Sequence, residues 1–244
     1  MPVLTDYALL VQWQARKISW LLPLIIGVQT VLAVGIIVGF GFLFPEVDPQ
    51  TALFLATGAP TLLLLVIGLV LVPQMVSEAK TEGTYDWMRA LPVPRMAFLA
   101  ADATVWFLSM LPGLLVALAV ARWHYELDLS VSPLVVVAVV LVGLTATGVG
   151  YAIASFVPPM ITLLLTNLLL FVALMFSPVN FPAERLPGWL QAVHEVLPIT
   201  AMADVMRGTL AQDEFGLTAG PFVVLAIWCA IGFTASHLAM NRRG

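Results

Sequence analysis

Residues 129–183 read LSVSPLVVVAVVLVGLTATGVGYAIASFVPPMITLLLTNLLLFVALMFSPVNFPA and contain no Asp, Glu, Lys or Arg. A helix needs about 20 apolar residues to cross the hydrocarbon core of a bilayer, and a globular core does not call for so long an uncharged run. Pro158 and Pro159 divide the stretch, because neither can donate a backbone hydrogen bond to a continuing helix. We therefore predict two membrane-spanning helices, over about residues 133–157 and 159–179.

The rest of the chain has a composition that suits the same environment. Of its 244 residues, 61% are hydrophobic and 10% are charged, and the mean hydropathy is +1.03. Soluble domains carry roughly 25% charged residues. We predict an all-α polytopic membrane protein with six transmembrane helices in a single transmembrane domain, residues 1–244. The four further spans lie at about residues 20–44, 51–76, 97–121 and 218–238.

The basic residues predict how these spans are oriented. Six crossings leave both termini on one side, and loops rich in Lys and Arg stay in the cytoplasm. The termini and the segment after the second span hold seven basic residues, whereas the opposite loops hold three among many carboxylates. We therefore expect a multi-pass protein of the cell (inner or plasma) membrane with both termini cytoplasmic, and without a removable signal peptide. The seven are Arg16, Lys17, Lys80, Arg89, Arg95, Arg242 and Arg243; the three are Arg122, Arg185 and Arg207.

Shorter segments have helical spacing but cannot span. Residues 3–18 place four apolar side chains on one arc, which Gln14 interrupts, so we expect a helix lying on the membrane surface. The outer segment, residues 180–216, contains two more. Trp189 and its apolar neighbours oppose His194 across a helix from Pro187 to Leu197, which Pro198 stops, and Thr200 is predicted to cap a second helix that runs to Gly208. We expect both to lie in or dip into the outer leaflet.

Several kinds of active site have no counterpart in the sequence. An ion-coupled carrier needs an ionisable group within the membrane, but Asp102 and His237 lie near the ends of spans, and we interpret them as groups that reach the interface. His194-Glu195 lacks the second histidine of a zinc-protease motif, and neither a Gly-x-Ser-x-Gly elbow nor a phosphate-binding loop is present. We expect no metal, cofactor or catalytic residue on this chain, and any ATP hydrolysis on another polypeptide.

The densest charge cluster follows the second span. Residues 77–96 read SEAKTEGTYDWMRALPVPRM, with three carboxylates and three basic groups. This stretch can be an ordinary solvated loop. Its aromatic residues, its glycine and its two prolines instead indicate a shaped segment, and a compact charged element at the membrane face suits docking in a groove of a soluble partner.

Two loops carry recognisable patterns. The first, after span two, is Glu78, Gly83-Thr84, Pro92-Val93 and Arg95. The second, after span five, is Ser177-Pro178, Phe181-Pro182, Leu186-Pro187-Gly188-Trp189-Leu190, Leu197-Pro198 and Arg207-Gly208. Together and in these places, they resemble the type-2 permease family of ATP-binding-cassette exporters, and with the six spans the resemblance covers nearly the whole chain. Ala101-Asp102 departs from the family, which often has a small residue and a basic one there.

The resemblance implies a division of labour. Residues 77–96 would form a coupling helix on separate ATPase subunits, which would hold ATP and magnesium. Two permeases, as a homodimer or a heterodimer among membrane lipids, would form the pathway, and the outer segment would re-enter the leaflet. No nucleic-acid partner is expected. The coupling residues would be Glu78, Glu82, Gly83, Thr84, Asp86, Arg89 and Arg95, and those of the outer segment Pro187, Trp189, Pro198 and Arg207.

Polar residues on the spans are the remaining candidates. Thr57 and Thr61 lie one turn apart on the second span, and so do Thr162 and Thr166 on the fifth, where Asn167 adjoins them. These residues can hydrogen-bond neighbouring helices together. Alternatively, they line a sparsely polar cavity, which the family builds from spans two and five.

The scarcity of charge on these faces favours an amphipathic or lipid-like cargo, because a highly charged solute would find few partners there. We expect a permease that moves a drug or antibiotic, rather than a glycan, out of the cytoplasm or the inner leaflet. The alternative is a non-transporting membrane scaffold that anchors a soluble partner through its cytoplasmic loop. An intramembrane enzyme is the weakest hypothesis, because the nucleophile and metal spacings are missing.

Overall fold

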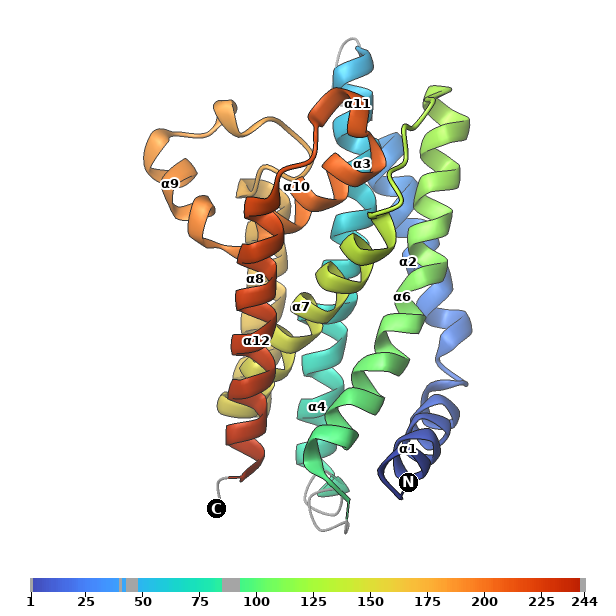
Figure 1. Ribbon diagram of the computed structural model, residues 1–244, viewed down its shortest axis with the longest axis vertical. Helices are drawn as coiled ribbons and strands as arrows, with labels where there is room; N and C mark the ends of the chain where they lie inside the picture. Colours follow the sequence, from blue (N-terminus) through green and yellow to red (C-terminus); the bar gives the residue numbers. More distant parts are fainter. Residues whose placement is uncertain (1, 40, 43–47, 85–92, 242–244) are drawn as a thin grey trace.

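The computed structural model describes residues 2–39, 41–42, 48–84 and 93–241, and these residues form helices and connecting turns without a strand (Figure 1). Within them, six helices are long and apolar enough to cross a membrane, which confirms the predicted all-α fold with six spans. They run Leu22–Gly39, Pro49–Thr81, Arg95–Tyr125, Val135–Phe156, Pro159–Phe176 and Ala219–Met240.

The elements follow the chain in the order expected. Helix α1 (Pro2–Ile18) precedes the first span, which is α2 (Leu22–Val34) with the π-helix η1 (Gly35–Gly39). The second span is α3 (Pro49–Leu65), the π-helix η2 (Val66–Leu71) and α4 (Val72–Thr81). The next three are α6 (Arg95–Tyr125), α7 (Val135–Phe156) and α8 (Pro159–Phe176), and the last is α12 (Ala219–Asn241). The outer segment holds η3 (Ala183–Arg185), α9 (Gly188–Val196), α10 (Pro198–Leu210) and α11 (Gln212–Phe215).

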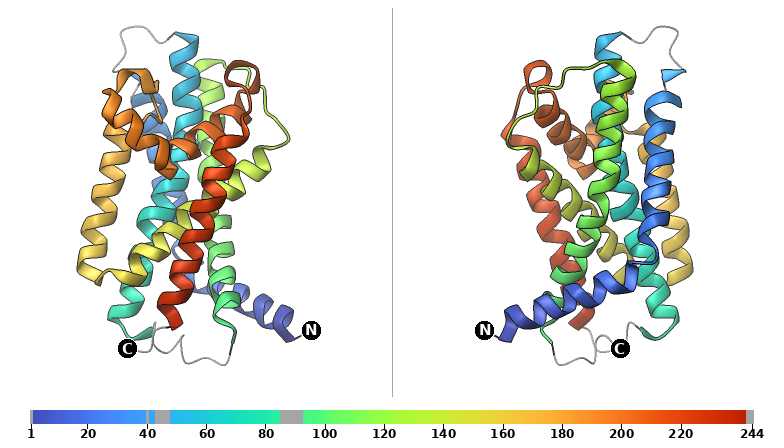
Figure 2. Two further views of the ribbon diagram at one scale, coloured as in Figure 1. Left: turned by 60° about the vertical axis from the view of Figure 1, so that its left-hand side comes forward. Right: turned by 90° about the vertical axis from the view of Figure 1, so that its right-hand side faces the viewer.

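The two ends of the bundle differ. Both termini lie at one end, here called the lower end, and α9, α10 and α11 gather at the other, the upper end (Figures 1 and 2). Helix α1 does not run along the bundle but lies across its side at the lower end and projects away from it (Figure 2). It is fastened to α6, where the Tyr7 hydroxyl and Oγ1 of Thr104 are 2.8 Å apart.

The second span is the centre of the bundle. In its apolar 18-residue window 89% of the residues are buried, whereas in the windows of the α8 and α12 spans 17% are, and these two spans expose large apolar side chains. Exposed apolar faces on spans are the surface that lipid or another membrane helix covers. Pro73 near the start of α4 has no N–H for the carbonyl one turn earlier, which accounts for the wide π-helical turns of η2 just before it.

Glycines bring α7 close to its neighbours on both sides. A Cβ on Gly150 would lie 2.0 Å from the carbonyl oxygen of Gly68 in η2, and one on Gly232 would lie 2.6 Å from the carbonyl carbon of Gly148. Helices that meet in a membrane commonly use small residues so that their backbones can approach. Helix α7 is therefore locked between the central span and α12.

Several predicted boundaries differ from the observed ones, and two of them have a clear physical reason. The loop expected from residue 77 begins later, because α4 continues to Thr81 through good helix-forming residues with no proline to stop it. The second outer helix begins at Pro198 rather than after a Thr200 cap. Proline fits the first turn of a helix, where its missing N–H would have no partner, so Pro198 both ends α9 and starts α10.

Candidate functional site

The segment predicted to contact an ATPase leaves the central span at the lower end. Glu78 and Glu82 are exposed, the first on the last turn of α4 and the second at its C-cap. Gly83 follows with φ +76°, a left-handed conformation that glycine adopts without strain and that ends a helix. Thr84 is half-buried. Asp86 and Arg89 lie outside the described residues, and their role stays a prediction.

Two basic residues fasten the ends of this segment to other spans. The Lys80 ammonium donates to the carbonyls of Ala154 and Ser155, the latter at 3.1 Å, in the last turn of α7. Nη1 of Arg95 donates to the carbonyl of Met240 at 2.7 Å, in the last turn of α12. The final carbonyls of a helix have no partner within it and carry partial negative charge. Both cations therefore bind helix C-termini, which the sequence did not indicate.

The four threonines predicted for the pathway are buried and hydrogen-bonded within their own helices. Thr57 and Thr61 on α3, and Thr162 and Thr166 on α8, are at most 1% exposed. Each hydroxyl donates to the carbonyl four residues earlier, over 2.7 to 3.1 Å. This local bond satisfies the hydroxyl without help from a neighbouring helix.

Asn167 differs from the threonines, because it reaches the surface of the chain. It lies on the exposed face of α8 among Leu164, Leu168 and Phe171, and its Nδ2 donates to the carbonyl of Leu163 at 2.7 Å. A polar amide on an otherwise apolar span surface suits contact with another membrane helix or with a polar pathway.

The outer segment turns an apolar face outward. Pro187 stands at the N-cap of α9, Trp189 is 70% exposed, and His194 on the opposite side is buried. Nε2 of His194 lies 2.9 Å from the carbonyl of Phe176 at the end of α8. Pro198 is buried at the start of α10. An exposed aromatic and aliphatic face above a buried polar side chain is the arrangement expected of a helix in contact with lipid.

Arg207 joins four parts of the upper end, and we call its contacts the Arg207 clasp. Its Nη1 pairs with Asp204 at 3.1 Å, and its Nη2 donates to the carbonyl of Val179 at 2.9 Å. The guanidinium carbon lies 4.2 Å from the ring centre of Phe54 on α3 and 5.5 Å from that of Phe215 on α11. A cation over aromatic faces is attracted by the ring electrons. The clasp therefore fixes the outer segment on the central span.

Burial acts on both charges of the clasp. It lowers the pKa of the Arg207 guanidinium to about 10, against the influence of Asp204, so the group is still charged at neutral pH. Burial also raises the pKa of the Asp204 carboxyl, which Arg207 partly offsets. Burial thus removes water from each ion, and the opposite charge of its partner restores part of the lost electrostatic stabilisation.

The loop that meets the clasp also presses against the central span. A Cβ on Gly58 would lie 2.2 Å from Oδ1 of Asn180 and 2.6 Å from the carbonyl oxygen of Val179. Asn180 is 4% exposed, and neither polar atom of its amide has a partner among the described residues. Sequence reasoning missed this contact. A glycine among large apolar residues on a span was the available signal, and Asn180 offered none.

A metal site does not emerge from this geometry. Across residues 2–39, 41–42, 48–84 and 93–241, no three His, Cys, Asp or Glu side chains converge on a point that could hold a metal ion.

Comparison with known proteins gives a family match, which includes most of the regions described above. The model of a family described as ABC-2 type transporter matches residues 3–211, from the start of α1 to just past the end of α10. The match takes in the segment after the central span and Arg207 itself, but not Phe215 of the clasp. The curated proteins contain no match to the chain.

Proposed function

The chain belongs to the ABC-2 type transporter family, and on that premise we propose that it is the permease subunit of an ATP-driven exporter. ATP hydrolysis then takes place on a separate nucleotide-binding subunit. The cargo is an amphipathic or lipid-like molecule, a drug or antibiotic rather than a glycan, which leaves the cytoplasm or the inner leaflet.

The observation that carries the proposal is the attachment of the lower-end segment to several spans. The segment continues from α4, Lys80 ties its start to α7, and Arg95 begins α6 and holds α12. A displacement imposed on the segment is therefore transmitted to four spans. A solvated loop without such attachments would absorb the same displacement in its own backbone.

The surface of the segment supports an ionic contact with a partner. Glu78 and Glu82 are exposed, and no hydrogen bond or ion pair to another described residue occupies the Glu82 carboxylate. Complementary charge sets orientation and encounter rate at protein interfaces more than it sets affinity. We assign Glu78, Glu82 and Thr84, with Asp86 and Arg89, to that contact.

The proposed function also requires an orientation of the chain in the membrane, because ATP is in the cytoplasm. We place the lower end in the cytoplasm, because the basic residues concentrate there. In this orientation the coupling segment meets cytoplasmic ATPase subunits, and the Arg207 clasp and α9 lie at the outer leaflet.

The transport pathway is assigned to the exposed face of α8. Asn167 is the polar group on that face, and its neighbours are apolar. A second permease, either a copy of this chain or a different one, would cover the face and leave a sparsely polar passage. Such a passage suits an amphipathic molecule and disfavours a highly charged one.

The test is reconstitution of the full-length chain with its ATPase in proteoliposomes, followed by measurement of ATP turnover and cargo efflux. The double charge reversal Glu82→Lys with Asp86→Lys should lower ATP turnover and cargo efflux by roughly tenfold or more, because like charges across a contact cost several kcal/mol. The matched control is Asp213→Lys with Glu214→Lys, two exposed carboxylates at the upper end, which should leave both unchanged.

Unchanged turnover and efflux in the lower-end variant would remove the coupling role. An ATPase that binds and is stimulated, while no drug, lipid or glycolipid moves, would favour the scaffold over the exporter.

A further inference from the structure

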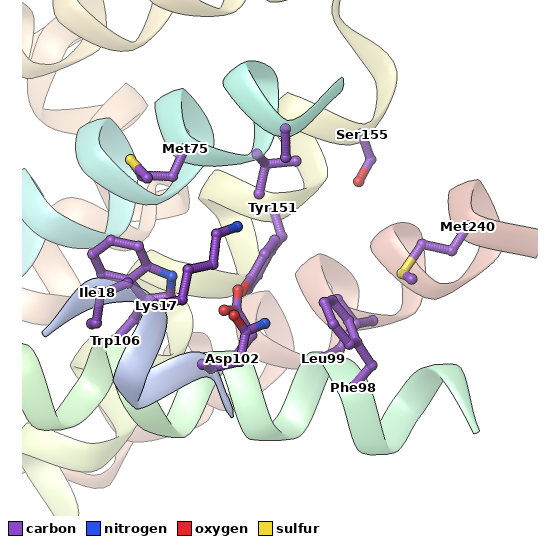
Figure 3. Close-up of a pocket in the computed structure, with 13 residues that line it drawn as sticks. Lys17, Ile18, Met75, Phe98, Leu99, Asp102, Trp106, Tyr151, Ser155 and Met240 are labelled. Atoms are coloured by element: carbon purple, nitrogen blue, oxygen red, sulfur yellow. The ribbon is translucent and has the colours of Figure 1, made fainter. Parts of the chain in front are cut away.

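A cavity of about 40 Å³ lies at the lower end between α1 and the bundle (Figure 3). Its polar lining consists of Asp102 from α6, Gln14 and Lys17 from α1, and Tyr151 and Ser155 from α7. We call this cavity the head pocket. It lies where α1 meets α4, α6 and α7.

Asp102 in the head pocket lacks a bound counter-ion. The cation that acts on it is Lys17, yet among the described residues the two side chains form no ion pair. The Lys17 ammonium is exposed and lies 6.0 Å from the ring centre of Trp13. Lys80, the other nearby cation, donates to the carbonyls at the end of α7. The partly buried carboxylate thus has a hydrogen bond with the Trp106 side chain but no ion-pair partner among the described residues.

Aromatic side chains form the walls around this carboxylate. Phe98, Trp106 and Tyr151 line the pocket and are at most 7% exposed. The Tyr151 hydroxyl is buried and has no partner among the described residues, and Figure 3 shows it and Asp102 directed into the same space. Buried polar groups are rarely left unpaired. A carboxylate, a free hydroxyl and aromatic faces together complement an organic ammonium group.

An apolar groove adjoins the head pocket. It has about 270 Å³, runs between α1, α2 and α6, and shares Ile18 with the head pocket. Its lining includes Leu22, Val105, Leu108 and Pro112, and Leu108 is 53% exposed. We call it the tail groove. From the shared Ile18 it extends along α6 to Pro112, and its lining is almost entirely apolar.

We propose that the head pocket and the tail groove together bind an amphipathic organic ammonium, with its cationic head on Asp102 and Tyr151 and its apolar body along α6. An anionic head is disfavoured, because it would meet the Asp102 carboxylate. Lys17 competes weakly for the same carboxylate from the rim. The assignment of this ligand as cargo entering from the inner leaflet rests on the proposed function, whereas its binding does not.

The experiment measures binding of radiolabelled dodecylammonium to the full-length chain in phosphatidylcholine nanodiscs, with empty discs subtracted. Wild-type chain should bind it saturably, and uncharged dodecanol should not compete. Asp102→Asn should weaken binding by roughly tenfold or more, because the isosteric amide removes the charge that a bound cation needs. Asp128→Asn is the control, since that carboxylate is exposed at the other end of α6, and it should change nothing.

A Lys17→Gln variant separates a binding role from a structural one. If Lys17 competes with the ligand, its removal should tighten dodecylammonium binding about threefold, because a nearby like charge is lost. If Lys17 and Asp102 serve only to hold α1, the same change would leave binding unaltered or weaken it. Asp102→Glu should retain most of the binding, and an unchanged elution profile and unfolding temperature confirm that each variant is folded.

The tail groove has its own matched pair of variants. Ala15 lines the groove, whereas Ala8 is exposed on α1 outside it. Ala15→Leu should fill the groove and weaken binding severalfold, and Ala8→Leu should not.

Equal binding by wild type and Asp102→Asn, equal competition by dodecanol, or unaltered or weaker binding by Lys17→Gln would overturn the proposal. Displacement of dodecylammonium by phosphatidylethanolamine in the discs would assign the site to a resident lipid and overturn the cargo role. The binding experiment contains no ATPase, so it tests the site independently of transport. Saturable binding in nanodiscs together with a lack of ATP-driven efflux in proteoliposomes would count against the proposed function alone.

Discussion

Arg207 at the upper end is buried and Asp102 at the lower end is half-buried, in a chain of which only 10% of the residues are charged. Their surroundings differ. Arg207 meets a carboxylate, a backbone carbonyl and two aromatic rings. Asp102 meets no ion-pair partner among the described residues, and the Tyr151 hydroxyl beside it is unpaired.

The difference separates structural charge from charge that is available to a ligand. A buried ion whose hydration is replaced by its own chain holds elements together, and removing it leaves the partners unpaired. A partly buried carboxylate that has a hydrogen-bond donor but no cation beside it is instead available to a cationic ligand. Changes at the two ends should therefore act in opposite ways on stability and on binding.

The largest effect is expected from Arg207→Met. Losing the ion pair, the carbonyl bond and the ring contacts should lower the free energy of unfolding by about 2–4 kcal/mol. Thermal unfolding of the purified chain in nanodiscs measures this. The control is Arg122→Met, whose pair with Asp128 is exposed at 68% and 99% and should change stability by less than about 0.5 kcal/mol. Similar losses in both variants would show that the clasp is not a structural joint.

Gly58→Ala should follow with a loss of about 1–3 kcal/mol, because the new methyl group would meet the Asn180 side chain and the Val179 carbonyl. The comparison variant is Gly27→Ala on α2, where a Cβ would have no atom within 4 Å and should stabilise the helix slightly. The same unfolding measurement applies. Equal stability of the two variants would mean that the outer segment does not rest on the central span.

Asp102→Asn should have a smaller effect of opposite sign. Removing a carboxylate without an ion-pair partner should leave the unfolding temperature unchanged or raise stability by up to about 1 kcal/mol. A loss comparable to that of Arg207→Met would place Asp102 among the structural charges and erase the contrast between the two ends.

The smallest expected effect concerns pH at the clasp. Burial raises the pKa of Asp204 above the unfolded value of 3.8, so the folded state binds this proton more tightly. The contribution of Asp204 to stability is then fully present below pH 3.8 and is lost as pH rises through the raised pKa. The free energy of unfolding is measured for wild type and for Asp204→Asn across this pH range, and the difference between the two gives the contribution of Asp204. A difference that grows with rising pH would contradict the assignment.

Much of the fold could be predicted from the sequence. The six spans follow from runs of apolar residues, since a bilayer acts on each segment through its own composition. The positions of the two outer helices followed from proline and from helical spacing. The boundaries at residue 77 and at Thr200 were less well predicted, because helix ends depend on backbone partners that the pattern does not specify.

The candidate sites could be predicted only in part. Arg207 and the charged segment after the central span stood out because charge is rare in this chain. The attachment of Lys80 to α7 and of Arg95 to α12 joins residues 74 and 145 positions apart, and nothing local indicates it. The contact between Gly58 and Asn180 is of the same kind.

Gln14 shows where the two sources of information meet. The sequence by itself determined that α1 is helical with an apolar arc, and also that Gln14 interrupts the arc, because helical periodicity depends on local spacing. Only the tertiary structure decided that this amide is 3% exposed and lines the head pocket beside Asp102. Apolar segments enter a membrane one by one, but a polar group is satisfied or left open by residues that folding brings to it from elsewhere in the chain.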